Sequence, residues 1–296
     1  MLLAIALLNL FVELAGAADK IVCDGIVFHN VYFDREIIVA GLGRPNNLVV
    51  HKFSETIFFS HTVRNGSNVD FSVMSCHIEK KDCKEIDGVP GGYAIAYDAG
   101  NDDIYFGGHN GIYKYNFLNK SAEFFAEEGK SIWGLFIRKN FYYIEYPTQK
   151  LFVYEDDRFD IVQEAINIEI DNFFVSKTGD VYFSNETALY KVEKIGRVTT
   201  VLGDDMVIRQ IVEDKYGDVY FCGGDGVYIE EKPYHRIRKI AEIDKAFGLT
   251  FDEDDHIIYS NSDTIYRLLP SNISDVCFSE MNGDSPRDQF KDRLLS

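Results

Sequence analysis

The residues of this chain that could bind a ligand occur at the starts of regularly spaced apolar segments. They are three aromatic residues, one cation and two carboxamides: Tyr93, Trp133, Phe247, Arg44, Asn172 and Gln210. Flat rings can stack on a planar ligand, and an arginine can hold a carboxylate with two parallel hydrogen bonds. Because the chain has a net charge of −18, binding an anion requires a local cation, and Arg44 is the favoured one. The sequence therefore predicts a site for a planar anion.

Three of these assignments have alternatives. Trp133 could fill the hydrophobic core, as large aromatic residues commonly do. Arg44, which precedes Pro45, could close a loop. Arg209 could occupy the place assigned to Gln210. Stability and affinity measured on the same variants would separate a core role from a ligand contact.

Patterns that indicate catalysis or metal binding are weak in this chain. Asp171 and Asn172 resemble ligands of a hard cation such as calcium, but neighbours on a strand point to opposite faces. The seven histidines contain no pair at the short spacing of zinc ligands. There is no Gly-x-Ser-x-Gly segment and no phosphate-binding loop. We therefore expect no metal, no cofactor and no catalytic residues.

One pattern recurs six times, namely a short aromatic strand, a turn of Gly, Asn or Asp, and a second strand. The copies align on Phe59, Phe106, Tyr143, Phe183, Phe221 and Tyr259, in steps of 47, 37, 40, 38 and 38 residues. A period near 40 residues indicates a β-propeller. The sequence therefore predicts an all-β fold, a six-bladed β-propeller of four-stranded blades, as a single domain over residues 18–277.

The ends of the repeat region predict how the ring closes. The sixth blade has three strands before Pro270, and an N-terminal strand at 35–39 can supply the fourth. Closure would bring Cys23 to Cys277, so we predict that pair. Cys76 and Cys83 flank a hairpin loop and are the second predicted pair, whereas Cys222 lies in a core strand as a buried free thiol.

The chain has the features of an exported protein. Residues 1–17 form an apolar segment ending in small residues, which predicts a signal peptide cleaved after Ala17. Four glycosylation sequons begin at Asn65, Asn119, Asn185 and Asn272. The acidic charge disfavours nucleic acid and anionic membranes as partners. We expect a secreted monomer with a disordered tail over residues 278–296.

Several spaced motifs resemble the insect ommochrome-binding proteins over residues 1–277. These motifs are Cys-Asp-Gly at 23–25, Gly-Gly-Tyr-Ala-Ile-Ala-Tyr at 91–97, the glycine-rich hairpin at 105–115, and Ile-Tyr-Arg-Leu at 265–268 followed by Val-Cys at 276–277. The resemblance implies a secreted haemolymph protein that carries a planar, anionic, tryptophan-derived pigment at the channel mouth without catalysis. The alternative is a calcium-dependent lactonase or esterase-like hydrolase, because six-bladed propellers of the gluconolactonase kind place their chemistry at this mouth. A protein-binding scaffold is the third possibility.

Overall fold

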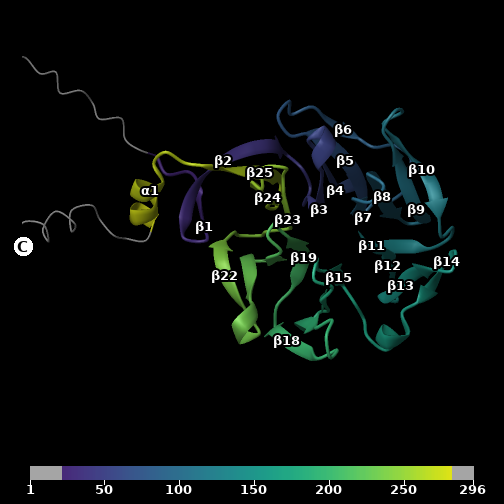
Figure 1. Ribbon diagram of the computed structural model, residues 1–296. Coiled ribbons are helices and arrows are strands. Elements are labelled where there is room, and N and C mark those ends of the chain that lie inside the picture. Colours follow the sequence, from purple (N-terminus) through teal and green to yellow (C-terminus); the bar gives the residue numbers. More distant parts are fainter. Residues whose placement is uncertain (1–21, 282–296) are drawn as a thin grey trace, which may run out of the picture.

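The computed structural model describes residues 22–281 and shows six β-sheets arranged as a ring around a central channel (Figure 1). This confirms the predicted six-bladed propeller. The strands of every blade are antiparallel, and in five of the six blades they follow one another in sequence from the channel outward. The predicted signal peptide lies outside the described residues, as do residues 282–296. Among the described residues, no helix is both long and apolar enough to cross a membrane.

The strands are assigned to blades in chain order. Blade 1 contains β3 (Asn46–His51), β4 (Thr56–Asn65), β5 (Asn68–His77) and β6 (Cys83–Glu85). Blade 2 contains β7 (Ala94–Asp98), β8 (Asp103–Gly108), β9 (Gly111–Asn116) and β10 (Ser121–Ala126). Blade 3 contains β11 (Ser131–Arg138), β12 (Asn140–Tyr146), β13 (Lys150–Glu155) and β14 (Arg158–Ile161). Blade 4 contains β15 (Asn172–Val175), β16 (Val181–Ser184), β17 (Ala188–Val192) and β18 (Thr199–Asp204).

The last two blades and the short helices complete the fold. Blade 5 contains β19 (Ile208–Glu213), β20 (Val219–Gly223), β21 (Gly226–Glu231) and β22 (Arg236–Glu242). Blade 6 contains β23 (Gly248–Phe251), β24 (Ile257–Ser260), β25 (Thr264–Pro270), and the N-terminal strands β2 (Val31–Ala40) and β1 (Ile26–Phe28). The helices are η1 (Lys52–Ser54), η2 (Gln163–Ala165), η3 (Lys232–Tyr234) and α1 (Ser274–Met281).

The unbroken apolar strands are buried because each blade is covered on both faces by its neighbours. In β20 every residue is buried, and side chains on a strand alternate between its two faces. Val219 and Phe221 pack with residues of blade 4, whereas Tyr220 and Cys222 pack with residues of blade 6. The core is therefore a series of layers between blades.

The N-terminal strand closes the ring, as predicted. Strand β2 pairs with β25, and Glu36 lies opposite Arg267 in the register. The closing strand is longer than the expected segment 35–39, and β1 adds a fifth strand to this blade. Arg267 donates to Glu36 at 2.8 Å, so an ion pair also joins the first and last strands.

Both predicted disulfides are confirmed. Cys23 bonds Cys277, with Cα atoms 5.5 Å apart, and Cys76 bonds Cys83 across paired positions of β5 and β6. Cys222 is a buried free thiol, as predicted. The expected tail boundary at residue 277 is corrected, because Cys277 lies inside α1 and residues 278–281 complete this helix. The sequence did not predict this helix, because a segment of eight residues is too short to show a clear helical pattern.

Candidate functional site

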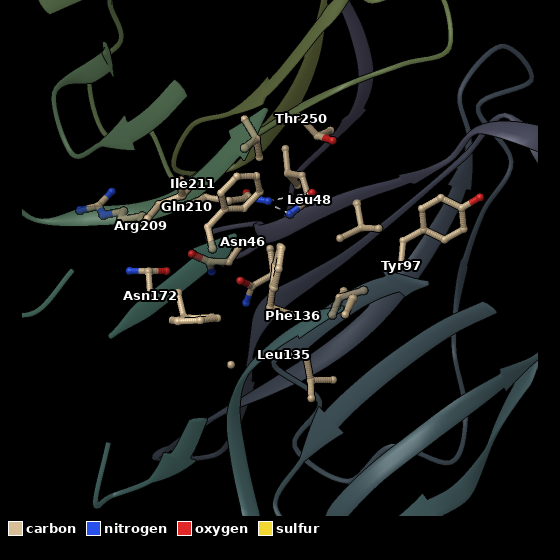
Figure 2. Close-up of a pocket in the computed structure, with 18 of the residues that line it drawn as sticks. Asn46, Leu48, Tyr97, Leu135, Phe136, Asn172, Arg209, Gln210, Ile211 and Thr250 are labelled. Carbon is tan, nitrogen blue, oxygen red and sulfur yellow. Dashed lines mark hydrogen bonds between the residues drawn. The ribbon is translucent and has the colours of Figure 1, made fainter. Parts of the chain in front are cut away.

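The central channel forms a cavity of about 850 Å³, lined mainly by the first strand of each blade (Figure 2). We call the end where these strands begin the upper mouth, and the end where they finish the lower mouth. All six predicted ligand residues line this cavity: Arg44, Tyr93, Trp133, Asn172, Gln210 and Phe247. The structure therefore brings the predicted residues to one channel. Their side chains differ in how far they are already hydrogen-bonded to other protein groups.

Two β-bulges place side chains at the upper mouth. In blade 3 the register passes from Ile132 opposite Glu145 to Gly134 opposite Ile144, which leaves Trp133 as the extra residue. In blade 5 it passes from Ile208 to Gln210 in the same way and leaves Arg209 as the extra residue. A bulge changes the direction of a side chain relative to regular alternation. Trp133 and Arg209 line the cavity as a result.

An aromatic group forms one side of the upper mouth. Tyr93 and Trp133 stack with their centroids 4.1 Å apart and their planes at 18°. Phe71, from the long hairpin of β4 and β5, meets Tyr93 edge-on at 4.6 Å. Tyr146 contacts Trp133, with ring centroids 5.6 Å apart, and does not itself line the cavity. Trp133 is only half-buried, so it is a wall of the cavity instead of a closed core residue.

The hydroxyl of Tyr93 remains protonated at neutral pH. Burial raises the pKa of Tyr93 to about 12, and a hydrogen bond with Asn47 opposes this shift. The charges of Arg209 and Asp171 contribute smaller shifts of opposite sign to this pKa. The cavity therefore presents a neutral phenol, which can donate a hydrogen bond to a ligand oxygen or accept one.

Two guanidinium groups lie at the upper mouth. Arg209 stacks on Phe247, with Cζ 4.0 Å from the ring centroid, and donates a hydrogen bond to the carbonyl of Ala246. Arg44 is exposed and lines the cavity from the segment before β3. Within residues 22–281 neither arginine has a carboxylate partner in an ion pair. Both cations are therefore available to an anionic ligand.

The side chains of Gln210 and Asn172 are instead bound to neighbouring blades. Gln210 Nε2 donates to Leu48 O at 2.8 Å, and its Oε1 accepts from the amide of Leu48 at 3.2 Å (Figure 2). The same Oε1 also accepts from the amide of Leu249 at 3.0 Å. A Cβ on Gly248 would lie only 2.6 Å from the side chain of Leu48, so glycine leaves room for this contact. Asn172 Nδ2 donates to Ile208 O at 2.7 Å. These carboxamides connect blades, and the Gln210 oxygen and the Asn172 nitrogen are already engaged.

The two residues that resemble calcium ligands diverge. Asp171 accepts a hydrogen bond from Gln149 of blade 3, whereas Asn172 donates to blade 5. Burial raises the pKa of the Asp171 carboxyl, and this hydrogen bond opposes the shift. In the part of the chain that the structure describes, no three residues of the His, Cys, Asp and Glu types come together as a metal site.

At the lower end, an ion pair joins blades 3 and 5 over the end of blade 4. Arg138 Nη1 lies 2.9 Å from Glu213 Oε2, and the Glu213 side chain is only 1% exposed. The backbone amide of Lys177 also donates to Glu213 at 2.9 Å. Glu213 therefore holds Arg138 and the turn of Lys177 together, and the ion pair links blades 3 and 5.

Sequence reasoning missed three residues at the upper mouth. Arg209 was considered only as an alternative to Gln210, because the bulge in β19 has no sequence signal. Phe71 and Tyr146 lie in β5 and β12, outside the first strands to which the prediction was restricted. The length of the β4–β5 hairpin, visible as the gap of 47 residues before the second repeat, was the available signal for Phe71.

Comparisons with known proteins define the fold class and give one sequence relative. No protein-family model matches the chain. Among solved structures, a gluconolactonase from Xanthomonas campestris superposes with a TM-score of 0.65 at 12% identity, over 83% of this chain and 94% of that one. The calcium-binding protein regucalcin from Agrobacterium tumefaciens gives 0.61 at 10% identity, over 80% and 95%. The chain is thus a six-bladed propeller of the architecture that these proteins share.

The sequence relative is more specific. The chain is similar to the ommochrome-binding protein of Manduca sexta, with 28% identity over 251 residues. This alignment covers 83% of the present chain and 91% of the relative. The similarity therefore extends over nearly the whole propeller and is compatible with a distant relative.

Proposed function

We propose that this protein is a non-enzymatic carrier that binds a planar, anionic aromatic pigment of the ommochrome class at the upper mouth. The observation that carries the proposal is the presence of stacked rings, Tyr93 and Trp133, beside two guanidinium groups without carboxylate partners. The outer face of a ring stack accepts a flat ligand, and arginines bind carboxylates. The name of the Manduca sexta relative supports this ligand class.

The size and polarity of the cavity also suit such a ligand. Its volume of about 850 Å³ falls in the range of roughly 300–1,000 Å³ that is usual for small-molecule sites. Apolar residues dominate the interior, including Leu135, Phe136 and Ile211 (Figure 2). The few polar groups at the mouth would then fix the orientation of the pigment.

The alternative hydrolase has less support from the residues at the mouth. The likeness to the gluconolactonase, at 12% identity, concerns the fold alone. Asp171 is the one acidic residue that lines the described cavity at its upper mouth, and Gln149 already binds it. A hard cation requires six to eight oxygen ligands, and such a set is not gathered here.

We also propose that the carrier acts outside the cell, in haemolymph. Two intrachain disulfides link residues of the propeller, and disulfides persist in oxidising compartments. Such bonds are rare in proteins of the cytosol. Export therefore agrees with the predicted signal peptide.

Calorimetric titration with an ommochrome, in the presence of a calcium chelator, tests this function. We expect saturable binding of one pigment per chain, unchanged by the chelator. The absence of any ommochrome binding would contradict the proposal. Calcium-dependent hydrolysis of a lactone by the same preparation would favour the hydrolase.

A further inference from the structure

Three apolar side chains protrude from neighbouring turns of the lower face, the face that surrounds the lower mouth. Ile195 lies between β17 and β18, Tyr216 between β19 and β20, and Tyr234 between β21 and β22. Their exposed fractions are 87%, 78% and 68%. Because strand direction alternates in an antiparallel blade, turns after the first and third strands all lie on this face. The three tips therefore point out of one side of the ring.

Polar contacts connect these turns into one surface. Lys232 Nζ donates to Gly217 O at 3.0 Å, which joins the two turns of blade 5. His235 Nδ1 lies 4.0 Å from Glu193 Oε1 and joins blade 5 to blade 4. Exposed tyrosines grouped in this way are typical of protein interfaces, because each buries a large ring at a low cost in conformational entropy.

Charges of opposite sign lie on the two sides of this apolar surface. On blade 4, Lys194 and Arg197 are exposed and have no ion-pair partner within residues 22–281. On blade 6, the turn after β23 carries Glu253 and Asp254, which are likewise exposed and unpaired in the described part of the chain. Lys215 Nζ lies 3.7 Å from Asp255, so the turns of blades 5 and 6 adjoin. The unpaired charges that flank the tips are therefore basic on blade 4 and acidic on blade 6, and blade 5 between them also carries Lys215 and Lys232.

A surface with this order is complementary to itself. A twofold axis that lies in the lower face and passes through blade 5 places blade 4 of one copy over blade 6 of the other. We propose that the lower face of blades 4 to 6 binds a second copy of this chain, with Tyr216 and Tyr234 at the centre. Lys194 and Arg197 of each copy then face Glu253 and Asp254 of the second copy. This dimer replaces the monomer expected from the sequence.

Charge favours a second copy as the occupant. With a net charge of −18, most orientations of two chains repel each other, whereas this one aligns opposite charges at two symmetric places. The upper mouth stays open in the dimer, and pigment binding is expected to be the same in both states.

Sedimentation of the wild-type chain at about 1 to 100 µM, where interfaces of moderate size associate, tests the proposal. We expect twice the monomer mass at the high end and weaker association as salt is added. Lys194→Glu with Arg197→Glu should weaken the dimer about tenfold or more, as should Glu253→Lys with Asp254→Lys. Arg64→Glu with Lys245→Glu, an equal charge change on the upper face, which points away from the second copy, should leave it intact.

The decisive step mixes the two charge-reversed variants. Each repels itself, but blade 4 of one now complements blade 6 of the other at both symmetric places, so the mixture should form a heterodimer. A wild-type chain that stays monomeric at the highest concentration would overturn the proposal, as would a mixture that stays monomeric. If the monomer instead bound vesicles of phosphatidylserine through Tyr216 and Tyr234, the surface would be a membrane contact and the dimer would be wrong. Ommochrome binding is measured in a separate titration. Neither outcome of the sedimentation experiments therefore decides the proposed function.

Discussion

Tyr93 and Trp133, which come from neighbouring blades, stack on each other at 4.1 Å across the upper mouth. Each ring covers one face of the other, so a flat ligand cannot enter between them without separating them. It can stack only on an outer face of the pair, beside Phe71, which contacts Tyr93, or beside Tyr146, which contacts Trp133. The stack is therefore a preformed platform, and a platform that needs no reorganisation costs less binding free energy.

Removing one ring of the platform should weaken pigment binding more than it destabilises the fold. For Trp133→Ala we expect a loss of about 0.5–1.5 kcal/mol in binding, beyond the area lost. The free energy of unfolding should fall by less than the roughly 3–5 kcal/mol that truncation of a fully buried aromatic residue costs, because Trp133 is half-buried. Calorimetry and denaturant unfolding on the same variant check both values. A large fall in stability with unchanged affinity would assign Trp133 to the core.

Gln210 should behave as a structural residue. Gln210→Ala removes one acceptor and one donor that serve the backbone of Leu48 and Leu249, and leaves these groups buried without partners. A stranded buried polar group costs about 1–3 kcal/mol, so the free energy of unfolding should fall by at least about 2 kcal/mol. Denaturant unfolding measures this loss, with the exposed Gln163→Ala as a control. Equal stabilities of the two variants would show that the inter-blade contact is unimportant.

The two disulfides should differ in their contribution to stability. The Cys23–Cys277 bond closes a loop of 254 residues and the Cys76–Cys83 bond a loop of 7. Chain entropy then gives about 5.5 kcal/mol for the long closure and about 2.5 kcal/mol for the short one. Serine replacement of each pair, compared by denaturant unfolding, checks the order. A larger loss on removing the Cys76–Cys83 bond would contradict ring closure as the main effect.

His61 should make the fold less stable in mild acid. Its Nδ1 is buried and has no hydrogen-bond partner among residues 22–281, and burial lowers the pKa of this imidazole below its usual 6.5, against a smaller opposing effect of Glu85. Below pH 6.5 the unfolded chain then binds more protons than the folded chain, so stability falls as the pH falls through this window. His61→Gln should reduce the drop in melting temperature between neutral pH and pH 5.5. The lower pH is roughly one unit below the ordinary pKa of histidine. An equal drop in the variant would contradict this assignment, and the exposed His235→Gln is the control.

The repeat, the ring closure and the disulfides could be predicted because they depend on periodicity and chain ends. The aligned aromatic residues, such as Phe106 and Phe221, are fully buried, and their spacing sets the number of blades. Cys23 and Cys277 flank the closing strands, so closure alone brings them together. These features depend on patterns that extend along the whole chain.

The details of the upper mouth could not be predicted in the same way. A bulge shifts the alternation of a strand by one residue, so Arg209 stacks on Phe247 at the mouth while Gln210 binds the backbone of Leu48. One inserted residue has no compositional signature, so the sequence could not decide between these two neighbours. Phe71 reaches the mouth only because its hairpin is long, which is a property of tertiary structure.

The central claim is that a planar anionic pigment binds at the upper mouth, and the fluorescence of Trp133 tests it most directly. Trp133 is the only tryptophan of the chain, so its emission reports on this site alone. Titration of the wild-type protein with an ommochrome should quench this emission to saturation. In the Arg44→Gln, Arg209→Gln double variant, loss of charge-assisted hydrogen bonds worth about 1.5–3 kcal/mol each should shift the midpoint at least tenfold. Arg158→Gln, on the outer strand of blade 3, should leave the midpoint unchanged. Equal midpoints for the wild type and the double variant would contradict the claim.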